Sequence, residues 1–483
     1  MKKSSPKNTS LSFRTEEDAL GSVQVPKEAY YGSFTARAQA NFKISGVTAP
    51  TYFRIALGKI KQAACQANLQ LKQLSTKEAK AIDQAAQEFI DGKFNDQFTL
   101  DVFQAGAGTP YNMNTNEIIA NRANEILGSP KGSYKPVNPN NHVNMAQSSN
   151  DVTPTAVRLS VLMAFQDLKR EMKLIQAALE KKGRTFGSLL KIGRTHLEDA
   201  VPITLGQEFM AYASALKTAL DLIKEAETSL CTIGLGGTAT GTGINTHPHY
   251  AKIVVQRLSR LTGFKLRTAP NLIETTHSMA VFLKASSALR SLAVEVNRIA
   301  NDLRLLNMGP NGGIAEIILP EVEPGSSIMP GKVNPSVAEC MNMICFQVIG
   351  NDHAVSLGTQ GGQLELNWFT PLILHNLLFS CQIMTNGLKM FREDCINGII
   401  ANKTQIKKLF DHSLVTATAL APYLGYHEVA RLVNEGLKRH KPIRELVLGK
   451  GLMEPKDLDR VLSPNAMIQP ALVDQKLIQK YGH

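Results

Sequence analysis

Five long segments without an interior proline dominate the middle of the chain, and they restrict its possible folds most. They cover about residues 155–182, 205–232, 274–308, 336–358 and 371–395. In the third segment, apolar residues from Met279 to Leu306 recur at steps of three and four, which gives one apolar stripe about 45 Å long on a helix. The pattern predicts a mainly α fold whose central domain is a long five-helix bundle.

The fourth and fifth of these segments are apolar nearly all round. A helix with apolar residues on every side needs partners on every side, so we expect deep burial and packing between copies of the chain.

The remaining sequence divides around this central region. Residues 1–12 are basic and polar and are interpreted as a disordered tail. The 483 residues are enough for about three domains. We predict an N-terminal domain over 13–150, the helical bundle over 151–401 and a small helical C-terminal domain over 402–483, where proline and glycine return.

Composition excludes several classes of function. No run of eighteen apolar residues occurs, so the sequence predicts no membrane span. The net charge of +12 could indicate a nucleic-acid partner, but the lysines form no basic stripe interleaved with aromatic residues. A basic surface would also steer anionic substrates. The six cysteines form no C-x-x-C pair, which favours a reducing cytoplasm over a disulfide framework.

Four polar blocks stand apart from the helical pattern, each at the expected boundary of an element. They are GAGTPYNMNTNE at 106–117, NPNNHVNMAQSSND at 138–151, GRTHLEDAVP at 193–202 and GSSIMPGKVNP at 325–335. Residues 100–150 are rich in asparagine, glycine and proline, and we interpret them as loops of a site region. In the last block, hydroxyls, one lysine and one amide between turn-forming residues suit a small dianion such as a dicarboxylate.

No cofactor is expected from the motifs. The sequence has no H-E-x-x-H pattern or other set of metal ligands. The glycine-rich run IGLGGTATGTG at 233–243 is not followed by the acidic residue of a dinucleotide site, so a nucleotide fold is rejected.

The four blocks, in this order, resemble the signature segments of the aspartase/fumarase superfamily, which eliminates a group from succinyl-type substrates to leave fumarate. The resemblance extends from about Phe13 to the C-terminal region. It implies a homotetramer in which three chains share each active site, with a small dicarboxylate or amino-acid substrate and no nucleic acid or membrane partner.

The resemblance also implies individual roles. Ser326 resembles the catalytic base, and His196 the histidine that a glutamate, here Glu339, accompanies. The residues that resemble substrate-binding groups are Ala107, Gly108, Thr109, Ser148, Ser149, Asn150, Thr195, Ser327, Lys332, Val333 and Asn334. A serine is a poor base unless its alkoxide is stabilised, so we expect nearby amides and a loop that closes over the substrate.

Two branches of the superfamily remain open. The segments NMNTNE, EAYYG, GQLELN and CINGIIAN are similar to those of aspartate ammonia-lyases, and Asn138 stands where fumarate hydratases carry a histidine of a secondary site. Ser149 and the segment GLGGTATGTGINTHP are closer to class II fumarate hydratases. We favour the ammonia-lyase. A non-catalytic helical scaffold is a third hypothesis, and the complete set of site residues argues against it.

Overall fold

The computed structural model describes residues 12–482, so the predicted tail lies outside it except for Ser12. The chain divides into two compact units. Unit 1 comprises Met1–Lys169, Leu220–Ala293 and Phe346–Thr385, and unit 2 comprises Arg170–Ala219, Val294–Cys345 and Asn386–His483. The division into four sequence domains is not tested by these units and stays a prediction.

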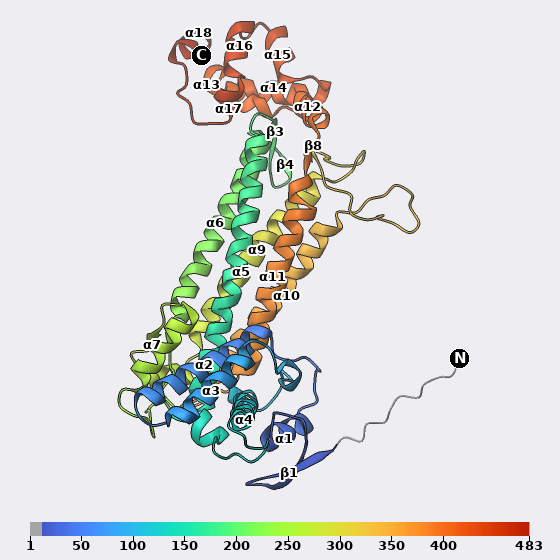
Figure 1. Ribbon diagram of the computed structural model, residues 1–483. Helices are drawn as coiled ribbons and strands as arrows, with labels where there is room; N and C mark the ends of the chain where they lie inside the picture. Colours follow the sequence, from blue (N-terminus) through green and yellow to red (C-terminus); the bar gives the residue numbers. More distant parts are fainter. Residues whose placement is uncertain (1–11, 483) are drawn as a thin grey trace, which may run out of the picture. The chain divides into compact units, whose positions relative to one another are not determined.

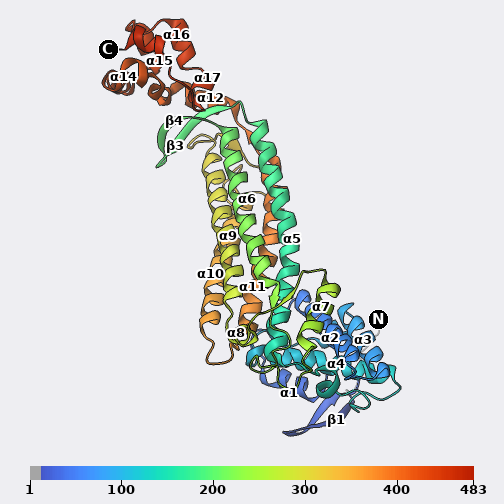
Figure 2. The same ribbon diagram turned by 90° about the vertical axis from the view of Figure 1, so that its left-hand side faces the viewer.

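Five helices of at least 25 residues confirm the predicted mainly α fold in the described part of the chain (Figure 1 and Figure 2). They are α5 Ser149–Thr185, α6 Leu205–Leu230, α9 Ala280–Leu306, α10 Ser336–Gln360 and α11 Thr370–Asp394. Their mainly apolar faces are buried, as the periodicity predicts. Between residues 12 and 482, no helix combines the length and the apolar character needed to cross a membrane.

The predicted third segment is interrupted, which corrects its boundary. A separate short helix, α8 Leu272–His277, precedes α9. Ser278 has extended backbone angles, φ −92° and ψ 120°, and its N–H group binds Glu274 O to end α8. The first segment instead begins earlier than predicted, at Ser149, with Pro154 inside its first turns.

Around the helices that it shares with unit 2, unit 1 contains a group of shorter elements. These elements are β1 Phe13–Asp18, β2 Gly21–Pro26, α1 Ser33–Asn41, α2 Thr51–Gln70, α3 Thr76–Ile90, η1 Asn95–Gln97, η2 Gly106–Gly108, α4 Thr109–Ile126, η3 Pro139–Val143, β5 Thr232–Ile233, α7 Tyr250–Thr262 and β6 Arg267–Thr268. Strands β1 and β2 form an antiparallel hairpin, and α2 packs against α3 and α7.

Unit 2 contains a second hairpin and the C-terminal helices. Its elements are β3 Leu190–Thr195, β4 Glu198–Thr204, β7 Ile317–Ile318, η4 Ile396–Gly398, β8 Ile400–Ala401, α12 Lys403–His412, η5 Val415–Leu420, α13 Ala421–Leu424, α14 Tyr426–Arg439, α15 Ile443–Gly449, α16 Pro455–Val461, α17 Pro464–Met467 and α18 Gln475–Tyr481. A small apolar core that includes Leu420, Leu432 and Leu458 holds the last helices together.

Helix α4 corrects the interpretation of residues 100–150 as loops. Its asparagines are buried, and Asn121 and Asn124 bind the backbone of neighbouring segments. Asn121 Nδ2 donates to Tyr30 O at 2.7 Å, and its Oδ1 accepts from Gly132 N at 2.7 Å. Asn124 binds both the N–H and the C=O of Val137 at 2.8 Å. These tertiary hydrogen bonds explain why a sequence rich in a poor helix former is nevertheless helical.

Helix α10 is less buried than predicted. Met343 is 64% exposed and Phe346 is 59% exposed, and Leu357 is also exposed on the same face. Burial on every side, as predicted for this segment, is therefore not reached within a single chain.

We predict that Asn124→Leu lowers the free energy of unfolding by about 2 kcal/mol or more, because it leaves two buried backbone groups of Val137 without partners. Urea denaturation followed by circular dichroism measures the change. Asn116→Leu is the matched control: Asn116 is also fully buried on α4, but its Oδ1 has no partner among the described residues. The control should lose less than about 1 kcal/mol. Equal losses would contradict the prediction.

Candidate active site

The predicted site residues fall into two groups, one in each unit. Unit 1 holds Ala107, Gly108, Thr109, Ser148, Ser149 and Asn150. Unit 2 holds Thr195, His196, Ser326, Ser327, Lys332, Val333, Asn334 and Glu339.

In unit 1 the predicted residues lie at the beginnings of α4 and α5. Ala107 and Gly108 both have left-handed backbone angles, φ 59° and 67°, and α4 begins directly after them at Thr109. A Cβ atom on Gly108 would lie 2.8 Å from Cγ2 of Thr153, so glycine is required where this turn packs onto the first turns of α5. The structure thus brings the blocks at 106–117 and 138–151 together.

The buried carboxylate of Asp151 fixes the start of α5. Its Oδ1 accepts a hydrogen bond from Ser148 N at 2.9 Å, and its Oδ2 accepts from Gly236 N and Thr238 N at 3.0 Å each. Burial raises the pKa of Asp151 to about 6, and these backbone N–H groups oppose that rise.

The glycine-rich run at 233–243, which the sequence did not connect with the site, is thereby explained. Its backbone N–H groups bind Asp151, and Ala239 O accepts from Asn150 Nδ2 at 2.8 Å. The run holds the turn at 148–151 in place, and its repeated glycines were the only signal in the sequence that the backbone comes close to another element here.

This arrangement favours anions. The N-terminal end of a helix carries a partial positive charge, and here two helices begin side by side. Hydroxyls and an amide from Thr109, Ser148, Ser149 and Asn150 lie at those ends. The group is suited to bind a carboxylate.

In unit 2, β3 and β4 form a hairpin (Figure 2). Thr195 and His196 lie at its exposed tip. His196 and Leu197 form its two-residue turn with φ 56° and 63°. No turn signal in the sequence marks this hairpin, because neither residue is glycine, asparagine or aspartate.

Buried charges brace the base of the hairpin. Glu316 is fully buried; its Oε1 accepts from both terminal nitrogens of Arg194 at 3.0 Å, and its Oε2 lies 3.1 Å from Lys191 Nζ. Lys191 Nζ also lies 3.4 Å from Glu208 Oε2. Two cations and two carboxylates therefore fix how the hairpin leaves the body of unit 2.

The loop at 325–335 closes on itself. Asn334 Nδ2 donates to Gly325 O, and a Cβ atom on Gly325 would collide with Lys332 O and Asn334 N. Within this loop, Ser326 Oγ accepts hydrogen bonds from Met329 N at 2.9 Å and from Ile328 N at 3.3 Å. Two N–H groups directed at this oxygen would stabilise negative charge on it.

Other predicted contacts are not formed in one chain. Within residues 12–482, no hydrogen bond or ion pair joins His196 to Glu339, which lies in the first turn of α10. Ser327, Lys332 and Val333 are exposed on the loop. Asn334, predicted to bind a carboxylate, uses its Nδ2 to close the loop.

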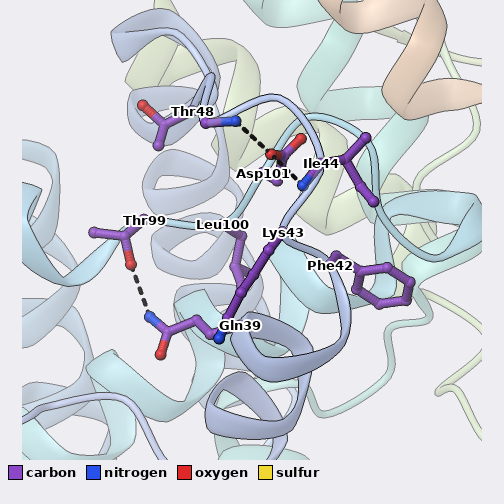
Figure 3. Close-up of a pocket in the computed structure, with 9 residues that line it drawn as sticks. Gln39, Phe42, Lys43, Ile44, Thr48, Thr99, Leu100 and Asp101 are labelled. Carbon is purple, nitrogen blue, oxygen red and sulfur yellow. Dashed lines mark hydrogen bonds between the residues drawn. The ribbon is translucent and has the colours of Figure 1, made fainter.

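A cavity of about 460 Å³ in unit 1 contains none of the predicted residues (Figure 3). Its one carboxylate, Asp101, already accepts from Ser45 N, Gly46 N and Phe103 N at 2.7–2.9 Å. Burial raises the pKa of Asp101, but these hydrogen bonds outweigh it and lower the pKa to about 2. The carboxylate serves to order the 44–48 turn, and the cavity is not the candidate site.

The long helices, the serine-bearing loop and the Thr-His hairpin belong to a chain that comparison with known families assigns to the lyase class. Residues 21–350 match the family described as Lyase, and residues 416–469 match the family described as Fumarase C C-terminus. The chain belongs to the aspartase/fumarase superfamily of lyases.

Individual relatives span nearly the full chain. The aspartate ammonia-lyase of Pseudomonas fluorescens is 46% identical over 97% of this chain and 99% of its own. The class II fumarate hydratase of Neisseria meningitidis is 43% identical over 95% of this chain and 100% of its own. A crystal structure titled fumarate lyase:delta crystallin from Brucella melitensis bound to cobalt has a TM-score of 0.92 and 44% identity, covering 95% of this chain and 100% of that one.

We predict that Glu316→Gln destabilises the β3–β4 hairpin by about 3–5 kcal/mol, because it leaves Lys191 and Arg194 without the buried negative charge that both contact. Hydrogen exchange of the backbone amides in β3 measures the free energy of opening. Asp199→Asn is the control, since Asp199 lies 4.0 Å from the same arginine but its side chain is 54% exposed. That change should be smaller than about 1 kcal/mol. Similar effects of the two substitutions would show that burial of the charge is unimportant.

Proposed function

We propose that this chain is an aspartate ammonia-lyase that converts L-aspartate to fumarate and ammonia reversibly. The main observation behind this proposal is the hydroxyl of Ser326. It accepts hydrogen bonds from two backbone N–H groups of the 325–335 loop, and Lys332 is exposed on the same loop. The sequence segments similar to ammonia-lyases, and the relatives of that name, support an amino-acid substrate.

The chemistry requires a base and a stabilised anion. Ser326, as its alkoxide, removes a proton from Cβ, and the electron pair passes into the adjacent carboxylate to give an aci-carboxylate. That pair then forms the C=C bond as the C–N bond at Cα breaks, and ammonia leaves. The N–H groups of Ile328 and Met329 favour the alkoxide form of Ser326.

Substrate binding is divided between the two groups of residues. The hydroxyl donors of unit 1, from Thr109, Ser148 and Ser149, hold one carboxylate at the helix beginnings, and Asn150, whose Nδ2 binds Ala239 O, offers its Oδ1 to the ammonium group. The positive charge of Lys332 binds the carboxylate that carries the developing charge. Thr195 and His196 face the reacting carbons, with Glu339 fixing the histidine tautomer.

We further propose a homotetramer in which each active site combines residues from three chains. Two observations support it. The first is the exposed apolar face of α10, which a second copy of the chain would cover. The second is that His196 and Glu339 form no hydrogen bond or ion pair with each other within residues 12–482 of one chain. Analytical ultracentrifugation measures the mass of the assembly.

Class II fumarate hydratase remains the alternative, because Ser149 and the 234–248 segment are closer to that branch and hydratases are among the relatives. The deciding experiment incubates the protein separately with L-aspartate and with L-malate and follows fumarate by ultraviolet absorbance. We expect fumarate from L-aspartate. Fumarate from malate alone would identify the hydratase, and fumarate from neither would favour a non-catalytic scaffold.

We predict that Ser326→Ala lowers kcat for L-aspartate about a thousandfold, the scale of a lost general base. Its assembly mass and circular dichroism should be unchanged, since the serine side chain lies on an irregular loop. Ser327→Ala is the matched comparison on the neighbouring, exposed hydroxyl, and it should reduce kcat far less. A near-normal rate for the Ser326 variant would show that another group is the base.

A further inference from the structure

A buried lysine lies beneath the beginning of α5. Lys61, on α2, is fully buried, and its Nζ donates to Asn112 Oδ1 at 2.7 Å, to Gln147 Oε1 at 2.9 Å and to Asn144 Oδ1 at 3.1 Å. Burial lowers the pKa of Lys61 to about 7, and the charge of Asp151 opposes that shift. None of these contacts belongs to the chemistry described above.

All three contacts of Lys61 Nζ are to amide oxygens, which is the pattern of the ammonium form, and this fixes the direction of the neighbouring amide. A protonated lysine has three donors and no acceptor, so each amide must turn its oxygen toward it. Asn112 therefore points Oδ1 at Lys61 and Nδ2 away from it. Nδ2 donates to Ser149 Oγ at 3.2 Å and to Asn144 Oδ1 at 3.1 Å.

The direction of that amide decides what Ser149 can offer. Its oxygen accepts from Asn112, and within residues 12–482 no acceptor takes its own proton. Ser149 is a largely buried residue, 9% exposed, at the helix beginning beside Ser148 and Asn150. The proton of Ser149 is thus left to donate outward, to an acceptor such as a carboxylate.

We propose that Lys61 is a positioning residue that, through the amide of Asn112, makes Ser149 an obligate hydrogen-bond donor to a substrate carboxylate. The inference rests on the proposed function, in which Ser149 contacts the substrate. It assigns a purpose to a buried charge that would otherwise only destabilise the fold. Neither Lys61 nor Asn112 touches the substrate itself.

Asn112→Asp tests the proposal at constant size. The new carboxylate still accepts from Lys61, but an oxygen replaces the donor that faced Ser149. Ser149 then donates its proton inward, and the substrate loses one hydrogen bond to a charged group. We expect the KM for L-aspartate to rise about tenfold or more, with kcat within about threefold. The carboxylate pairs with Lys61, but the variant also loses the donor to Asn144 Oδ1, so circular dichroism and the thermal unfolding midpoint are measured to show that it is folded at the assay temperature.

Asn144→Asp is the matched control. It adds the same charge beside the same lysine, since Asn144 Oδ1 also accepts from Lys61, but it leaves the donor from Asn112 to Ser149 in place. Its KM should stay within about twofold of the wild-type value. An equal rise in both variants would assign the effect to charge and overturn the proposal.

A double-mutant cycle with Ser149→Ala tests whether Asn112 changes KM through Ser149. If Asn112 acts through Ser149, Asn112→Asp raises KM in the wild-type background and adds nothing to Ser149→Ala. An equal rise in both backgrounds, or no rise in either, overturns the proposal. If Asn112→Asp is insoluble, Lys61→Met takes its place in the same cycle with the same expected outcome.

The wild-type reaction is the reference for all of these measurements. An active wild-type enzyme with an unchanged KM in Asn112→Asp would overturn this inference alone. A wild-type protein that forms no fumarate from L-aspartate would overturn the proposed function, and this inference with it.

Discussion

The carboxylate of Asp151 is the interaction on which the unit 1 part of the site depends. A helix beginning leaves N–H groups without partners, and buried groups of this kind must be satisfied. The first N–H groups of α5, on residues 150–152, bind Ser148, and Asp151 in turn accepts from Ser148 N and from Gly236 N and Thr238 N of the glycine-rich run. The longest helix is thereby attached to the glycine-rich run, and the hydroxyls at 148 and 149 keep fixed positions.

In unit 2, a buried carboxylate likewise positions a segment of the site, in this case the β3–β4 hairpin. The β3–β4 hairpin has an exposed tip and cannot be positioned there by packing, so it is fixed at its base. Glu316 joins Lys191, near the base of β3, and Arg194, which directly precedes Thr195 on the same strand. The exposed turn with Thr195 and His196 is therefore connected to a cluster of buried charges.

The sequence predicts the long helices well because their apolar periodicity is a local property. The stripe from Met279 to Leu306 needs no knowledge of the partners that cover it. Helix α4 escaped prediction because Asn121 and Asn124 bind Tyr30 and Val137, and side-chain propensities contain no information about such partners. The break at Ser278 was missed for a related reason, since a single extended residue leaves the apolar spacing on either side intact.

The site residues were predicted by resemblance, but the directions of their hydrogen bonds were not, and direction bears on the substrate. Serine and threonine both offer a hydroxyl, so Ser149 distinguishes poorly between the two branches. Asn150 is more informative: its Nδ2 binds Ala239 O, which leaves Oδ1 as its free group within the described chain. An ammonium has only donors and requires such an acceptor, whereas a hydroxyl can donate or accept. The anchoring of Asn150 by the glycine-rich run therefore supports an amino substrate, although that run itself is closer in sequence to the hydratase branch.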